Sequence, residues 1–278
     1  MAATPRPEFR HIPSREGLRY SWIRHIMRDS RDYVWFSSIY GSYRYDGHSF
    51  SDYSFSSTPG ASPFSVNQVY ETADSLLWIS TSGGLYCLDT HTETRVRHLD
   101  SLYVFAVTET ASGVLWAATN GGLFCKEGLN FHVVSGAENH ASAILIDSRG
   151  TLWVGTVDGR LLFSSGAEGH FSEVQLPDAL HSEVLHLMED RDHCIWICTA
   201  GSGAARYNLK TGESELFTTG TGYLDNNLVR DCIQTPDGTV WLGTEQGLAR
   251  IFPDGTTDRI KADSEFFRSL NDNAIYSL

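Results

Sequence analysis

The chain has 278 residues, of which 41% are hydrophobic and 20% charged, which is the composition of a soluble globular protein with one large domain or two ordinary ones. It has no run of about eighteen consecutive apolar residues, and its first residues lack a hydrophobic core, so we expect no membrane span and no signal peptide within it. A formal net charge of −13 disfavours nucleic acid as a partner, because affinity for phosphate backbones rests on Lys and Arg.

Tryptophan recurs in one sequence setting at intervals of 37 to 45 residues. Each copy is followed by a small residue at the second position and by Ser or Thr at the third, and five of the six copies have Gly at the sixth. The fixed period predicts a modular array. The six copies are Trp35, Trp78, Trp116, Trp153, Trp196 and Trp241.

The fourth repeat predicts four strands in chain order, at residues 143–147, 151–156, 160–163 and 170–174. The first two turns contain Asp147 with Gly150, and Thr156 with Gly159, which is the chemistry of tight hairpins. The second strand is apolar on both faces, so both faces need cover. Four-stranded units of 40 to 45 residues arranged radially provide that cover, as in a propeller.

We therefore predict an all-β fold, a β-propeller of four-stranded antiparallel blades with six complete repeats and flanking strands of an incomplete seventh. Each repeat tryptophan is expected to pack between blades rather than to stack on a sugar. The small residue two positions after each tryptophan, such as Gly155, is expected to leave room for the indole of an adjacent blade.

The two ends of the chain do not complete the ring. Residues 8–13 resemble the fourth strand of a preceding blade, and residues 271–278 align with the first strand of a seventh copy, with Ile275 and Leu278 in the apolar positions. Either six blades pack with loose terminal strands, or residues 1–278 form a single propeller region at the front of a longer sensor chain. We expect the second arrangement.

The pattern Asp-x-x-Gly-x-Leu-Trp-x-Gly-Thr-x-x-Gly-Leu-x-Arg resembles the two-component regulator propeller repeat. It is seen in residues 147–156, 237–250 and 35–47, and the resemblance spans almost the whole chain. Departures occur in the second repeat, with Thr72 and Ser75 for the turn Asp and Gly, and in the fifth, with His193 for the Gly.

The resemblance implies a periplasmic ligand-binding module of a hybrid two-component system. In that family, tandem seven-bladed propellers and an immunoglobulin-like domain precede a membrane helix and a histidine kinase, and many members detect oligosaccharides. We accordingly expect an oligosaccharide or other small ligand, no cofactor, and rearrangement of a homodimer. Kinase, receiver and membrane segments are not found in this sequence.

Ligand-contact residues are predicted from loop geometry alone. The turn between second and third strands lies at the same end of a blade as the connector into the first strand, and loops on a rigid scaffold are the usual place for binding residues. Trp22, outside the repeat register, suits sugar stacking, or alternatively plugs the ring. The predicted ligand-binding residues are Arg19, Tyr20, Trp22, Tyr40, His140, His181 and Asn226.

Other functional classes have weaker support. We find no nucleophile elbow, zinc-protease motif or P-loop, and predict no catalytic residue and no metal site. The five cysteines lack metal-type spacing and are expected to be buried free thiols. A non-catalytic protein-interaction scaffold is the main alternative, and a propeller lyase or glycosidase is a weaker one.

Overall fold

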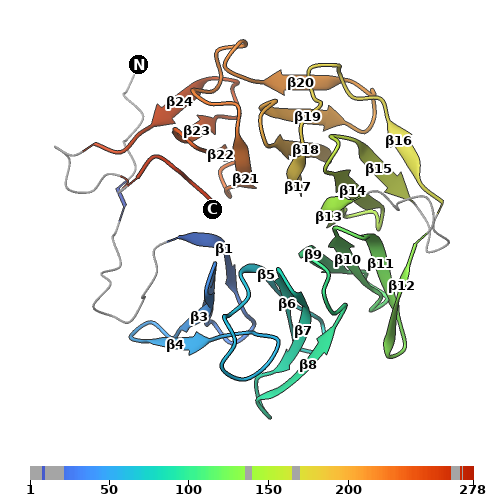
Figure 1. Ribbon diagram of the computed structural model, residues 1–278. Helices are drawn as coiled ribbons and strands as arrows, with labels where there is room; N and C mark the ends of the chain where they lie inside the picture. Colours follow the sequence, from blue (N-terminus) through green and yellow to red (C-terminus); the bar gives the residue numbers. More distant parts are fainter. Residues whose placement is uncertain (1–7, 10–21, 135–139, 165–169, 264–269, 271) are drawn as a thin grey trace.

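The computed structural model describes residues 8–9, 22–134, 140–164, 170–263, 270 and 272–278. Its 24 strands form six four-stranded antiparallel sheets, and the sheets stand as blades around a central axis (Figure 1). The predicted β-propeller with six four-stranded blades is confirmed. In the described part of the chain, no helix has the length and apolar character needed to cross a membrane.

Each blade is a meander in which consecutive strands pair, and its first strand is the innermost one (Figure 1). The strands are β1 (Ile23–Arg28), β2 (Val34–Ser38), β3 (Gly41–Tyr45), β4 (Phe50–Tyr53), β5 (Val66–Glu71), β6 (Leu77–Thr81), β7 (Gly84–Asp89), β8 (Thr94–His98), β9 (Val104–Glu109), β10 (Leu115–Thr119), β11 (Gly122–Glu127), β12 (Asn130–Val133), β13 (Ala141–Ile146), β14 (Leu152–Thr156), β15 (Leu161–Ser164), β16 (Ser172–Val174), β17 (Val184–Glu189), β18 (Cys194–Thr199), β19 (Ala204–Asn208), β20 (Ser214–Phe217), β21 (Val229–Gln234), β22 (Val240–Thr244), β23 (Gly247–Ile251) and β24 (Thr257–Ile260). In the fourth blade the predicted strands differ from β13–β16 by one or two residues at their ends.

The repeat tryptophans pack between blades, as predicted. Trp153 of β14 lies in one apolar cluster with Val184 and Ile197 of the next blade, and Trp196 lies with Val229 and Leu242 in the same way. Five of the six tryptophans are at most 5% exposed. The sixth, Trp241, is half-buried, because the described residues contain no complete blade beyond it.

The small residue after each tryptophan has a different neighbour from the one predicted. A Cβ built on Gly155 would lie 2.4 Å from Cγ1 of Val184, the first residue of β17. The space therefore admits the first strand of the next blade rather than an indole, and that part of the prediction was wrong. Trp153 and Gly155 share a face because strands have a period of two, so both face the same neighbouring blade.

The turn aspartate joins its hairpin to the tryptophan. Asp147 accepts backbone N–H groups of Arg149 at 3.0 Å and Thr151 at 2.8 Å through Oδ1, and the indole N–H of Trp153 at 3.0 Å through Oδ2. Asp29 and Asp190 do the same in their blades. A short polar side chain can thus satisfy both the tight turn and a buried donor.

The departures from the repeat pattern leave the turn conformation unchanged. Gly150 has a φ of 82°, and Ser75 and His193, which replace glycine, have φ values of 63° and 61°. A left-handed backbone is unfavourable for a residue with a Cβ, but it is tolerated where the surrounding hairpin fixes it.

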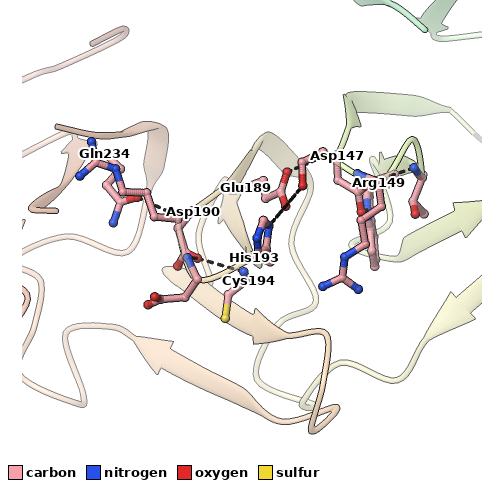
Figure 2. Close-up of polar contacts among 12 residues, drawn as sticks. Asp147, Arg149, Glu189, Asp190, His193, Cys194 and Gln234 are labelled. Atoms are coloured by element: carbon pink, nitrogen blue, oxygen red, sulfur yellow. Dashed lines mark hydrogen bonds and ion pairs between the residues drawn. The ribbon is translucent and has the colours of Figure 1, made fainter. Parts of the chain in front are cut away.

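Adjacent blades are also joined by a repeated polar contact between turns, which we call the inter-blade clasp. Glu189 at the end of β17 accepts the backbone N–H of Ser148 at 2.6 Å and its hydroxyl at 2.7 Å, and His193 Nδ1 lies 2.7 Å from the same carboxylate (Figure 2). Equivalent contacts join Glu71 to Ser30, Glu109 to Ala73 and Gln234 to Arg191. These contacts, made by residues of the turn that follows each first strand, hold neighbouring blades together.

The C-terminal segment, residues 272–278, occupies the place of the first strand of a seventh blade, beside β21 (Figure 1). Gly247 N donates to Asn273 O at 2.7 Å, as Gly203 N donates to Asn227 O at 2.8 Å one blade earlier. Ile275 lies against Gly243 as Val184 lies against Gly155. The other predicted flanking strand, residues 8–13, falls mostly outside the described residues.

All five cysteines are free. Cys194, Cys198 and Cys232 are buried, whereas Cys87 and Cys125 are half-buried in equivalent third strands. Burial raises the pKa of the Cys87 thiol to about 11, so this thiol is a poor nucleophile at neutral pH.

Candidate functional site

Every first strand contains a β-bulge near its beginning. In β17, Val184 pairs with Thr199 and His186 with Cys198, so Leu185 has no partner of its own. A bulge inserts one residue and re-aims its side chain. The six bulged residues are Arg24, Asn67, Phe105, Ser142, Leu185 and Arg230.

All six bulged residues line one cavity of about 310 Å³ at the centre of the ring. Because each blade supplies its innermost strand, the cavity is the central channel of the propeller. Its wall also includes Tyr103 and Glu183, which lie in connectors into first strands, and Tyr276 of the C-terminal segment. The channel therefore reaches the face on which the connectors lie. All six blades and the C-terminal segment thus contribute to a single concave site, as is usual for ligand pockets.

On one side of the channel, uncharged side chains accept hydrogen bonds from the guanidinium of Arg24. Arg24 Nη1 donates to Asn67 Oδ1 at 3.0 Å and to the Tyr103 hydroxyl at 3.2 Å. Tyr103 in turn donates to Asn67 Oδ1 at 2.9 Å, and Asn67 Nδ2 donates to Val104 O at 2.7 Å. Each member of the network is therefore fixed by another member or by backbone.

Another part of the channel wall contains a compensated cation. Arg230 Nε donates to Glu245 Oε1 at 2.9 Å, and its guanidinium lies 4.3 Å from the ring centroid of Tyr276. Ion pairing and cation–π contact both restrain this side chain. Glu183 lines the same cavity, and burial raises the pKa of its carboxyl group.

Three titratable residues each directly follow a bulged residue in the sequence: His25, His186 and Asp231. His186 Nε2 is 3.4 Å from Asp231 Oδ1, and Asp231 also accepts the backbone N–H of Leu278 at 2.8 Å. His25 Nδ1 is buried with no hydrogen-bond partner among the described residues. Burial lowers the pKa of His25 to about 4, and the nearby His186 adds to this while Asp231 opposes it. His25 is therefore neutral at neutral pH.

The predicted ligand residues lie on the loops rather than in the channel. Trp22 precedes β1 and is 64% exposed, and Tyr40 in the β2–β3 turn is 45% exposed. His140 and His181 are exposed in connectors, and Asn226 is half-buried with its Oδ1 accepting Leu228 N at 2.7 Å. None of these five lines the cavity, and Arg19 and Tyr20 lie outside the described residues.

The bulged residues were missed by the sequence prediction, although a signal for them exists. Apolar residues recur at spacing three in the first strands, as in Val66 with Val69, Val104 with Val107, and Val184 with Leu187. A regular strand has a period of two, so spacing three indicates an inserted residue. The residue after the first apolar position is the one that enters the channel.

Two further features do not form sites. A second cavity, of about 170 Å³, lies between the fifth and sixth blades, but Arg206 there is paired with Asp190 and Asp192, each at 2.6 Å. Groups of three or more His, Cys, Asp or Glu suited to a metal ion do not occur in the described part of the chain.

The β-propeller fold is shared with extracellular domains of bacterial two-component systems. The chain superposes on the extracellular domain of the putative hybrid two-component system BT4673 of B. thetaiotaomicron with a TM-score of 0.79 and 20% identity, covering 98% of this chain and 36% of that one. For BT3049 of the same organism the TM-score is 0.80 with 18% identity, covering 97% and 39%. Virginiamycin B lyase of Staphylococcus aureus also shares the fold, with a TM-score of 0.70 and 13% identity, covering 87% and 85%.

The repeats show a more specific similarity. The two-component regulator propeller model matches residues 135–165 and 223–246, so the predicted resemblance to this repeat family is confirmed. "Histidine kinase P4" of Formosa agariphila is 32% identical over 120 residues, which is 40% of this chain and 9% of that protein. The chain therefore spans between a third and two fifths of these extracellular domains and a small part of the curated relative.

Proposed function

We propose that this chain is a ligand-binding propeller of a two-component sensor, and that the central channel is its binding site. One observation carries the proposal: each of the six blades bulges at one residue, and all six bulged side chains line the same 310 Å³ cavity. A regular strand has no inserted residue, so each bulge adds a side chain aimed at the axis that strand pairing does not require. The two-component regulator propeller repeats and the similarity to ectodomains of hybrid two-component systems support the sensor role.

The ligand class that best suits this channel is an oligosaccharide. Sugars combine hydroxyl groups with apolar ring faces, so their sites combine polar side chains with aromatic rings. Tyr103 and Phe105 lie with ring centroids 4.7 Å apart, and the polar side chains of Asn67 and Glu183 line the same cavity. A cavity of this size holds one or two sugar rings, and loop residues such as Trp22 and Tyr40 would contact the rest of a longer chain.

Signalling would follow from differential affinity. A ligand that binds one arrangement of the sensor more tightly than another shifts the equilibrium between them, and a histidine kinase across the membrane would read the shift. This proposal places the chain in the periplasm and includes rearrangement of a homodimer. In this proposal the described propeller performs the sensing step.

The test is a thermal-shift and calorimetric screen against neutral and acidic oligosaccharides. We expect one sugar class to raise the melting temperature saturably, since a ligand preferring the folded state stabilises it. Phe105→Ala should abolish the shift, whereas Val133→Ala, at an exposed outer position, should retain it. Retention of the shift in Phe105→Ala but its loss in Trp22→Ala would move the site to the loops.

Two alternatives have distinct outcomes in the same experiment. A protein-interaction scaffold would show no sugar-dependent shift and would be stabilised by a protein partner alone. A lyase or glycosidase, the first suggested by the fold shared with virginiamycin B lyase, would convert the added compound, which chromatography of the samples would detect. Either result would replace the sensor proposal.

A further inference from the structure

We infer that the channel takes an acidic oligosaccharide, whose carboxylate or sulfate group is bound by the guanidinium of Arg24. This inference rests on the proposed function, because it assumes that the central channel is the ligand site. It names the chemical class of the ligand and the residue that selects it.

Arg24 is fixed in place without being neutralised. Its partners among the described residues, Asn67 Oδ1 and the Tyr103 hydroxyl, are both uncharged acceptors, and both contact the same nitrogen, Nη1. No carboxylate of the described residues forms an ion pair with Arg24. Its Nε and Nη2 groups therefore remain available as a planar pair of donors, which matches a carboxylate or sulfate.

The other arginine of the channel shows the contrast. Arg230 pairs with Glu245 and lies over Tyr276, so its charge is already compensated. Both arginines are bulged residues of first strands, in β1 and β21, so their backbone settings are equivalent. Of these two arginines, only Arg24 has no negatively charged partner among the described residues, so the anionic group of a ligand could pair with it.

Aromatic rings lie beside the guanidinium of Arg24. Tyr103 hydrogen-bonds Arg24 and has its ring centroid 4.7 Å from that of Phe105, which also lines the channel. A sugar ring against these side chains would place an acidic substituent within reach of the guanidinium. This combination of a charge and rings is the pattern expected for an acidic sugar rather than for a free inorganic anion.

The acidic groups of the channel do not cancel this preference. Asp231 is engaged by backbone N–H groups of Cys232 at 2.8 Å and Leu278 at 2.8 Å, and it also faces His186. Glu183 lies in the connector before β17, whereas Arg24 extends toward the second and third blades through Asn67 and Tyr103. Asp231 is thus already engaged, Glu183 has no ion pair with Arg24 among the described residues, and Glu183 is positioned to accept sugar hydroxyls.

The experiment is titration calorimetry with three probes of equal length: a galacturonate trisaccharide, a sulfated galactose trisaccharide and a neutral galactose trisaccharide. Wild type should bind an acidic probe at least tenfold more tightly than the neutral one, with affinity falling as salt rises. Preference between the two acidic probes distinguishes carboxylate from sulfate. Arg24→Gln should lose at least tenfold in affinity for the acidic probe only, and Arg24→Lys should lose less.

Arg28→Gln is the matched control, because Arg28 lies on the same strand and is exposed, paired with Asp32 at 2.7 Å outside the channel. It should bind like wild type, and unchanged melting temperatures should show that both variants fold. Tighter binding of the neutral probe, or an unchanged affinity in Arg24→Gln, would overturn the inference while leaving the proposed function in place. Binding of none of the three probes would overturn both.

Discussion

The carboxylate of Asp190 accepts the indole N–H of Trp196 at 3.0 Å across the hairpin of the fifth blade. The same carboxylate oxygen lies 2.6 Å from Nε of Arg206, the residue paired with Trp196 on the next strand. In the sixth blade Thr235 stands in place of this aspartate, and Trp241 Nε1 has no hydrogen-bond partner among the described residues. The sequence difference at one turn position therefore leaves a buried donor unsatisfied.

Thr235→Asp should stabilise the protein by about 1 to 2 kcal/mol, because the new carboxylate can accept from Trp241 Nε1 and from the buried, unpartnered Nε of Arg250. Arg250 pairs with Trp241 across the strands as Arg206 pairs with Trp196. Urea unfolding measures the change in the free energy of unfolding. Thr110→Asp is the comparison, since Trp116 is also unpartnered but pairs with Cys125, so its gain should be smaller.

Trp153→Ala should lower the free energy of unfolding by about 3 to 5 kcal/mol, because it leaves a cavity in an apolar cluster that joins two blades. Trp241→Ala should cost about half of that, since Trp241 is half-buried and belongs to none of the five inter-blade clusters. Chemical denaturation of both variants at one temperature provides the comparison. Equal costs would contradict the assignment of inter-blade packing as the source of the stability.

Gly155→Ala should destabilise the protein by about 1 to 3 kcal/mol through overpacking, because its Cβ would meet the side chain of Val184. Val184→Ala in the same chain should recover part of the loss. The preceding blade pair already has this combination, with Ala118 and Ala141 in one cluster. A double-mutant cycle measures the coupling, and strict additivity of the two costs would exclude direct contact as the cause.

Stability should fall as the pH is lowered from about 6.5 toward 4, in part because of His25. Its pKa is about 4 in the folded protein against an ordinary value of 6.5, so between these values the unfolded chain binds the proton more readily. Urea midpoints at pH 7.5 and 5 test this. His25→Gln should flatten the dependence, whereas His132→Gln, an exposed outer residue, should leave it unchanged.

The turn aspartates and the second strands that are apolar on both faces explain why so much of the fold could be predicted. Turn chemistry and two-faced apolar strands are local properties, so the sequence around Trp153 predicts a hairpin, its turns and its burial. The fourth blade accordingly differs from its predicted strands only at the ends. Ser75 and His193 departed from the pattern without consequence, because the neighbouring hairpin fixes their backbone.

The sequence by itself determined the repeat, the blade and the radial packing of tryptophans, because each depends on residues within about 40 positions of one another. Only the tertiary structure decided which side chains meet at the centre. Arg24, Asn67 and Tyr103 come from three blades, and nothing local relates them. Their meeting depends on the ring placing every bulged strand around one axis, so the spacing of apolar residues can mark each bulge, while the contacts between bulged residues appear only in the tertiary structure.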